Sequence, residues 1–247
     1  MFGYRKRTMN IFNPKSKDVF KLSRTKIERF IECPRCFYLD RRLGLDRPSG
    51  FPFTLNSAVD KLLKKEFDIH RAKKEKHPLM ETYKINAIPF VHEKMDEWRE
   101  NFVGVQALHK PTNLLIFGAV DDIWENKDGS LSVVDYKATS TTKEITLEEE
   151  YRKSYKRQME IYQWLLRQNG FNVSDDGYFV YVNGLTDKEA FDGKLEFDVQ
   201  VLKYTGNDDW VEKAITDAHK CLMGNKIPKA SWNCDYCKYR EEMKEVE

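Results

Sequence analysis

Two charged side chains interrupt an apolar strand near the middle of the chain. The stretch GSLSVVDYKATS, residues 129–140, places Asp135 and Lys137 directly after two valines. Side chains two residues apart on a strand point to the same face, so the carboxylate and the ammonium are expected to project together. Burying both charges is costly unless partners or a metal compensate them. Taken alone, the stretch is explained more simply as an edge-strand pair in contact with water.

A second carboxylate follows the preceding apolar run. The segment GAVDDIW contains Asp121 and Asp122, which face opposite sides of a strand, so only one of them can share a face with Asp135. If Asp121 does so, two carboxylates and a lysine meet at one place. Close carboxylates repel each other, and their oxygens suit Mg²⁺ or Mn²⁺. Such an ion could activate water for attack on a phosphate, with Lys137 orienting the hydroxide or offsetting negative charge.

A predicted helix at 151–170 adds one more polar pair. Gln158 and Tyr162 are spaced i and i+4, which places them on the same helical face. Tyr162 also fits the apolar stripe of this helix, and Gln158 could cover its rim. The pair therefore carries no functional weight by itself.

The elements that would position these residues alternate between helices and strands. Apolar spacing predicts helices at 22–34, with Ser23 as its cap, and at 54–68, 151–170 and 208–225. The runs 113–126 and 130–138, joined by a KDG turn, predict an antiparallel hairpin, and further strands are expected at 178–184 and 195–205. This order predicts an α/β fold with a central mixed sheet flanked by helices.

Three short motifs resemble, in sequence and order, those of a nuclease family. GAVDD, VVDYK and QMEIY are similar to the core motifs of the PD-(D/E)XK nuclease superfamily, in its RecB-like exonuclease branch, over roughly residues 23–239. The resemblance implies a restriction-endonuclease-like core. It also implies that Asp121 and Asp135 are metal ligands and that Lys137 is the catalytic lysine. Gln158 and Tyr162 would then be the helix pair that supports the site and the DNA strand.

The chain departs from that branch at one ligand position. The branch usually offers a histidine where LNSAVDKLL has Asp60. A carboxylate is a good ligand for a hard cation, so Asp60 could bind the metal instead, or the site could be degraded. His70 and His77 lie further along the chain, where surface positions are the simpler expectation.

Four of the five cysteines form two CxxC pairs. Cys33 and Cys36 stand in CPRC, and Cys234 and Cys237 stand in CDYC. In a reducing compartment such pairs favour a metal site over disulfides, and one Cys₄ site would tie both ends of the chain to the domain. Cys221 lies on an apolar helical face and is expected in the core.

The resemblance also bears on the metal that the cysteines would bind. RecB-like nucleases with CPxxFY, matched here by CPRCFY, often carry a 4Fe-4S cluster held by that first cysteine and three C-terminal ones. Here Met243 stands near the place of the third C-terminal cysteine, and Cys36 could supply the fourth thiolate. The resemblance favours the cluster, and Zn²⁺ is the alternative.

Length and composition indicate a folded protein. The 247 residues have a net charge of +2 and are 40% apolar, which predicts a single domain at 21–247, with two compact halves as the alternative. Only basic charged residues precede the first acidic residue, Asp18, and residues 1–20 are expected to form a flexible basic tail. No apolar run is long enough to span a membrane. The first residues, MFGYRKRTMN, lack the apolar core of a secretory signal, so we expect a cytoplasmic protein without membrane contact.

Together with these observations, the resemblance implies a hydrolase, a Mg²⁺- or Mn²⁺-dependent exodeoxyribonuclease acting on single strands or ends in DNA repair, recombination or defence. The chain has no GK[ST] nucleotide-binding loop, so a helicase or ATPase would be a separate partner. The alternative is a non-catalytic nucleic-acid-binding module with the same fold. A purely structural metalloprotein would leave Asp121, Asp135 and Lys137 without a role.

Overall fold

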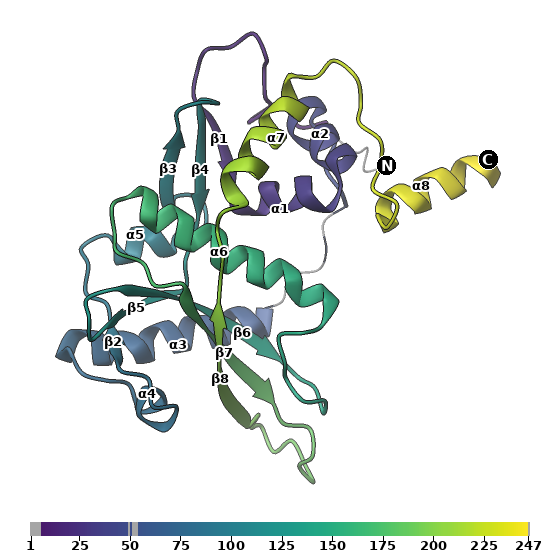
Figure 1. Ribbon diagram of the computed structural model, residues 1–247. Helices are drawn as coiled ribbons and strands as arrows, with labels where there is room; N and C mark the ends of the chain where they lie inside the picture. The colour runs from purple at the N-terminus through teal and green to yellow at the C-terminus, as the bar shows by residue number, and fades with distance from the viewer. Residues whose placement is uncertain (1–5, 49, 51–53, 247) are drawn as a thin grey trace. The chain divides into compact units, whose positions relative to one another are not determined.

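The computed structural model describes residues 6–48, 50 and 54–246. The chain divides into two compact units (Figure 1). Unit 1 comprises Met1–Phe51, Gln106–Phe117 and Asp209–Glu247, and unit 2 comprises Pro52–Val105 and Gly118–Asp208. Each unit is therefore built from segments that are far apart in the sequence. The predicted division into a tail and a single domain stays a prediction, and the first five residues of that tail lie outside the described part.

Unit 1 combines helices with a small sheet. Its elements are β1 (Phe20–Ser23), α1 (Arg24–Glu32), α2 (Pro34–Leu43), β3 (Val105–His109), β4 (Leu114–Gly118), α7 (Val211–Met223) and α8 (Asp235–Val246). The strands form a sheet in the order β1-β4-β3, with β1 parallel to β4. Helices α1, α2 and α7 pack against one another. Fully buried apolar side chains on all three helices, among them Ile27, Phe37 and Ile215, account for this packing.

The predicted helix at 22–34 is in fact the first of two consecutive helices. Ser23 occupies the cap position of α1, but its side chain forms no capping hydrogen bond there, which corrects the predicted role. Cys33 has an extended backbone, and Pro34 then begins α2. Proline fits this first position because the N–H that it lacks would have no partner within the helix. Helix α2 ends at Gly44, whose φ of 74° suits glycine. A Cβ atom at this position would lie 2.3 Å from the Arg7 carbonyl oxygen, so no larger residue fits.

Unit 2 is built on a mixed five-stranded sheet. Its elements are α3 (Thr54–Lys73), α4 (Pro78–Thr82), β2 (Ala87–Pro89), α5 (Met95–Arg99), β5 (Asp122–Asn126), β6 (Leu131–Thr139), the 3₁₀ turn η1 (Glu150–Arg152), α6 (Lys153–Gln168), β7 (Asp176–Gly184) and β8 (Phe197–Thr205). The strand order is β2-β5-β6-β7-β8. Strands β6 and β7 are parallel, and the other neighbours are antiparallel. This sheet and its helices confirm the predicted mixed α/β architecture.

The central strand β6 presents apolar side chains on one face and polar side chains on the other. Val134 and Tyr136 pack into an apolar core that includes Phe67 of α3. Asp135 points the other way and accepts a hydrogen bond from Gln158 of α6. Since side chains alternate along a strand, the polar residues of β6 gather on the face covered by α6.

The predicted hairpin is correct in its second half only. Strands β5 and β6 pair antiparallel, with Asp122 opposite Val134. The predicted first strand, 113–126, is broken after Gly118, because β4 belongs to the smaller sheet and β5 to the larger one. Asp121 therefore lies in the connection directly before β5 rather than within a strand.

The other predicted elements are found close to their expected bounds: α3, α6, α7, β7 and β8. None of the helices formed by the described residues has the length and apolar character needed to cross a membrane.

Candidate functional site

Asp121 is held by groups from three elements of unit 2. Lys64 of α3 places its Nζ 3.1 Å from Asp121 Oδ1, and the backbone N–H of Tyr136 donates to Oδ2 at 2.9 Å. Arg99 Nε donates to the Asp121 carbonyl oxygen at 3.0 Å. Burial alone would raise the pKa of Asp121, but the positive charges of Lys64 and Lys137 outweigh it and lower that pKa. Asp121 is therefore an anion at neutral pH.

The ammonium of Lys64 lies between two carboxylates. Its Nζ is 2.9 Å from Asp60, one helical turn earlier on α3, and 3.1 Å from Asp121. Burial and the negative charge of Asp121 raise the pKa of Asp60. Burial would lower the pKa of Lys64, yet the two carboxylates raise it, so the lysine is charged. Asp60 and Asp121 thus direct oxygens toward one cationic group.

Asp135 is fully buried at the centre of a second set of contacts. It forms an ion pair with Lys137 and accepts a hydrogen bond of 2.7 Å from Gln158 Nε2. The same amide nitrogen lies 3.2 Å from the Tyr162 hydroxyl. Burial would lower the pKa of Lys137, but the charges of Asp135 and Asp121 raise it. Because the Tyr136 N–H that holds Asp121 lies between Asp135 and Lys137 on β6, the two sets of contacts adjoin each other.

The structure therefore brings together every carboxylate-site residue predicted from the sequence: Asp60, Asp121, Asp135, Lys137, Gln158 and Tyr162. Sequence reasoning missed Lys64. Its spacing of four residues from Asp60 on one helical face was the available signal.

Asp122 faces away from this site and supports it from behind. It accepts a hydrogen bond of 2.7 Å from the Tyr136 hydroxyl and forms ion pairs with Arg71 and Arg99. Burial raises the pKa of Asp122 in spite of these arginines. Since Arg99 also binds the Asp121 carbonyl, this network fixes where the chain turns into β5.

The four cysteines of the CxxC pairs meet in unit 1. Cys33 directly precedes α2 and Cys36 lies on it, whereas Cys234 directly precedes α8 and Cys237 lies in its first turn. The Sγ atoms of Cys36 and Cys234 are 3.6 Å apart, as are those of Cys36 and Cys237, and Cys33 is 3.9 Å from Cys237. All four are buried free thiols whose sulfur atoms lie within 4.8 Å of one another. Such a group can hold a metal ion.

One of these thiols is prepared for metal binding by backbone donors. Burial would raise the pKa of Cys33, but hydrogen bonds from the backbone N–H groups of Cys36 and Ser231 help lower it to about 7. A thiolate is the form that ligates metal. Cys33 therefore reaches its metal-binding form near neutral pH.

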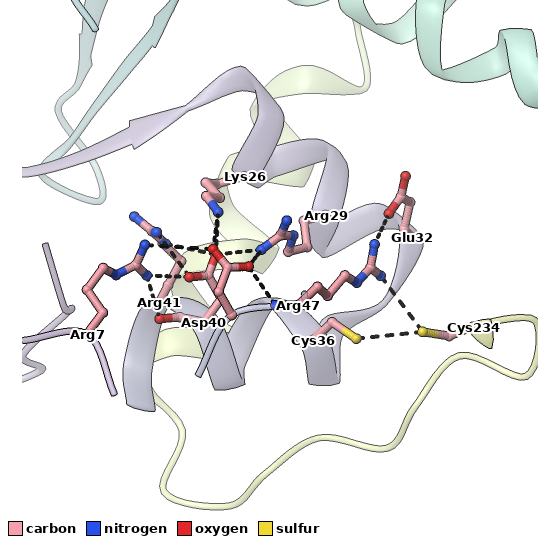
Figure 2. A network of polar contacts seen from close by, with 10 residues as sticks. Arg7, Lys26, Arg29, Glu32, Cys36, Asp40, Arg41, Arg47 and Cys234 are labelled. Carbon is pink, nitrogen blue, oxygen red and sulfur yellow. Dashed lines mark hydrogen bonds and ion pairs between the residues drawn. The ribbon is translucent and has the colours of Figure 1, made fainter. Parts of the chain in front are cut away.

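A buried carboxylate near this centre collects four cations. Figure 2 shows Asp40 of α2 surrounded by Arg7, Lys26, Arg29 and Arg41. Lys26 Nζ lies 2.7 Å and Arg29 Nη1 3.0 Å from Asp40 Oδ2. Burial would raise the pKa of Asp40, but the hydrogen bonds from Arg41 and Lys26 lower it to about 2. This ion network ties α1, α2 and the segment before β1 together.

Arg47 reaches from a neighbouring loop to the cysteines (Figure 2). Its Nη1 donates to Glu32 Oε2 at 2.6 Å, and its Nη2 lies 3.8 Å from Cys234 Sγ. Arg47 thus offers a positive charge to sulfur atoms that are anionic when they bind a metal.

Comparison with known proteins identifies the family of the chain. A family profile described as the PD-(D/E)XK nuclease superfamily matches residues 21–241. The chain belongs to this superfamily. It is also similar to a solved structure described as "Crystal structure of SSO0001", with 17% identity and a TM-score of 0.37 over 92% of this chain and 86% of that one. No curated protein matches.

Membership of the PD-(D/E)XK superfamily indicates a nuclease-type function that uses a divalent metal. Among the described residues, the three carboxylates Asp60, Asp121 and Asp135 do not gather as closely as the cysteines do. Their oxygens are nevertheless of the type that Mg²⁺ and Mn²⁺ prefer, and two of them already face one cation, the Lys64 ammonium. The donor set therefore fits a hard divalent cation, which Asp60, Asp121 and Asp135 would hold.

Two side chains differ from their expected surroundings. His77 is buried rather than exposed, and it caps α4 by accepting the Leu79 N–H at 3.1 Å while its Nε2 bonds to Glu66 at 2.9 Å. Both ring nitrogens are thus engaged in structural contacts. Cys221 is half-buried rather than a core residue, and burial raises its pKa to about 11. Neither residue belongs to the PD-(D/E)XK site.

Proposed function

We propose that this chain is a Mg²⁺- or Mn²⁺-dependent DNA nuclease, an exonuclease of the RecB-like branch that acts on single strands or ends in repair, recombination or defence. The observation that carries the proposal is the arrangement of Asp121, Asp135 and Lys137: Asp135 forms an ion pair with Lys137, and Asp121 accepts a hydrogen bond from the backbone N–H of Tyr136, which lies between them on β6. We further propose that it works in the cytoplasm and that any helicase or ATPase motor is a separate chain.

The proposed roles follow from the contacts of each residue. Asp121 and Asp135, with Asp60, would hold the divalent ion, which supplies activated water for attack on the phosphodiester. Lys137 keeps its positive charge and would offset the negative charge that grows on the phosphate oxygens. Gln158 positions Asp135 through a hydrogen bond of 2.7 Å.

The decisive experiment is cleavage of an end-labelled DNA strand with Mg²⁺ or Mn²⁺ and with EDTA. We expect metal-dependent cleavage that is abolished in Asp135→Asn and in Lys137→Ala, with the fold retained by circular dichroism. Asp135→Asn keeps an oxygen that can accept the Gln158 amide, so loss of activity would reflect loss of charge. Asp198→Asn, at an exposed position of β8, is the matched control and should leave cleavage unchanged. Full activity of Asp135→Asn would refute the assignment.

One observation favours the second candidate, a nucleic-acid-binding module without cleavage. The Lys64 ammonium lies between Asp60 and Asp121, where a metal ion would be needed. If Lys64 always occupied this place, the protein would keep its fold but could not bind the metal ion needed for cleavage. DNA binding that is unaffected by EDTA, together with no cleavage at any Mn²⁺ concentration, would support this candidate.

We also propose that the four-cysteine centre binds a single tetrahedral ion of the Zn²⁺ class. Four sulfurs around one zinc ion, with Zn–S bonds of about 2.3 Å, are separated by about 3.8 Å. The closest pairs here are 3.6, 3.6 and 3.9 Å apart. In a 4Fe-4S cluster each thiolate binds a different iron, so the cysteines must stand further apart than around one ion. The 4Fe-4S prediction stays open as the alternative.

Metal analysis of anaerobically purified protein separates the two centres. One zinc per chain in a colourless protein is expected for the single-ion site. A brown protein with about four irons per chain and absorbance near roughly 400 nm would establish the cluster instead. Freely reactive thiols at all four cysteines would exclude both.

A further inference from the structure

Three tyrosines surround the lysine of the candidate site, all within unit 2. The Lys137 Nζ lies 4.6 Å from the centre of the Tyr155 ring. The ring of Tyr151 meets that of Tyr155 edge-on, with centroids 6.4 Å apart. Tyr181 of β7 is paired with Lys137 across the parallel ladder, which puts both side chains on the same face of the sheet. The rings of Tyr155 and Tyr151 therefore follow one another from Lys137 toward the exposed side of Tyr151.

The outermost ring of this set is exposed but fixed. Tyr151 has 58% of its surface exposed, and its hydroxyl accepts a hydrogen bond of 2.9 Å from Arg152 Nε. Arg152 is itself buried, donates to the Thr146 carbonyl oxygen, and lies over the rings of both Tyr151 and Tyr181. A single exposed tyrosine is ordinary on a protein surface. A ring that a buried arginine holds in place, next to the Tyr155 ring on the candidate lysine, is preorganised for contact with a ligand.

The innermost tyrosine supplies a donor that the protein does not use. Tyr181 is 2% exposed, and no residue in the described part of the chain forms a hydrogen bond with its hydroxyl. Burial raises its pKa despite the positive charge of Arg152, so the hydroxyl keeps its proton at neutral pH. Buried hydroxyl groups are almost always paired, and an unpaired one beside a candidate active site points to a ligand that completes it.

We propose that Tyr151 and Tyr155 form a stacking surface for unpaired bases of a single nucleic-acid strand, and that the Tyr181 hydroxyl donates to the strand next to Lys137. This inference rests on the proposed nuclease function and specifies its substrate as single-stranded. A strand whose phosphate reaches Lys137 passes Tyr155 and then Tyr151. Bases inside a duplex stack on one another and cannot stack on a side chain, whereas unpaired bases can.

The test measures binding of a fluorescent oligonucleotide in EDTA, where cleavage does not interfere. An ordinary strand is compared with an abasic strand that keeps its phosphates but lacks bases. We expect the wild-type protein to bind the ordinary strand at least about tenfold more tightly than the abasic one, as stacking of one or two bases provides. Tyr151→Leu and Tyr155→Leu should each reduce this preference, because they remove the ring and keep an apolar side chain.

Two further variants complete the design. Phe102→Leu alters an aromatic ring that is 86% exposed elsewhere in unit 2, and it should leave the preference unchanged. Tyr181→Phe removes only the unpaired hydroxyl and should weaken binding of both strands by several-fold. Equal affinity of the wild-type protein for both strands, with active cleavage, would overturn this inference and leave the nuclease proposal standing. Absence of both DNA binding and cleavage would defeat the proposed function itself.

Discussion

Replacing Asp40 by asparagine should destabilise the helical part of unit 1. The burial and the ion pairs of Asp40 determine how large the loss of stability should be. The carboxylate is fully buried and its pKa is about 2, against an ordinary value of 3.8. That difference corresponds to about 2 kcal/mol of stabilisation of the charged form, or about thirtyfold in an equilibrium constant. Asparagine keeps the shape and loses the charge, so four cations would remain close together without their anion. Breaking buried pairs in this way costs about 3–5 kcal/mol, so the loss should be at least about thirtyfold.

The dependence on pH has a definite sign. The folded-state pKa lies below the unfolded one, so the stabilisation is fully present above about pH 4 and is lost as the pH falls through about 2. At pH 7, native-state hydrogen exchange of the α1 and α2 amides should be at least about thirtyfold faster in Asp40→Asn than in the wild-type protein. Near pH 2 the exchange rates of the two proteins should become similar.

The control is Glu242→Gln, the same chemical change at an exposed position of α8, which should leave exchange unchanged. An Asp40→Asn protein that exchanges within threefold of the wild type at pH 7 would refute the reasoning. So would a difference that is equally large at pH 7 and at pH 2, because the effect would then not come from the charge.

Three other outcomes follow from the site geometry. The Lys64→Met protein should bind Mn²⁺ at least about tenfold more tightly than the wild type in calorimetry, because the substitution removes a positive charge 3.1 Å from Asp121. Weaker binding would show that the lysine does not compete with the ion. Asp60→Asn should weaken Mn²⁺ binding about tenfold while Asp60→His preserves it, and unchanged titrations in both would place Asp60 outside the site. Cys33→Ser should lose bound metal and lower the melting temperature by about 10 °C, with a clearly smaller change in Cys221→Ser; equal shifts would argue against a shared metal centre.

The candidate site was predictable where its geometry is local. Asp135 and Lys137 share a face because side chains alternate along a strand, and Gln158 and Tyr162 share one because of helical spacing. These rules need only a few neighbouring residues. The assignment of Asp121 to the same site required a hairpin, and the hairpin from β5 to β6 is present.

The parts that the sequence did not predict depend on distant partners. The apolar run at 113–126 has the same pattern whether it forms one strand or is divided between two sheets, and only pairing with β1 and β6 decides the matter. Lys64 and Asp121 are 57 residues apart, and Arg47 and Cys234 are 187 apart. No periodicity or spacing rule connects residues at such separations. The second helix, α2, was hidden by Pro34, which was expected to end a helix and in fact begins one.

The placement of the cysteines has a consequence for the newly made chain. Cys33 and Cys36 leave the ribosome early, but their partners Cys234 and Cys237 follow about 200 residues later. At about 5–20 residues per second, this delay is about 10–40 s. During that interval the first two thiols cannot form a four-coordinate site. A four-thiolate site therefore cannot assemble before Cys237 has been made, and a chain that stops before Cys234 would carry half of the site exposed to other metals and thiols.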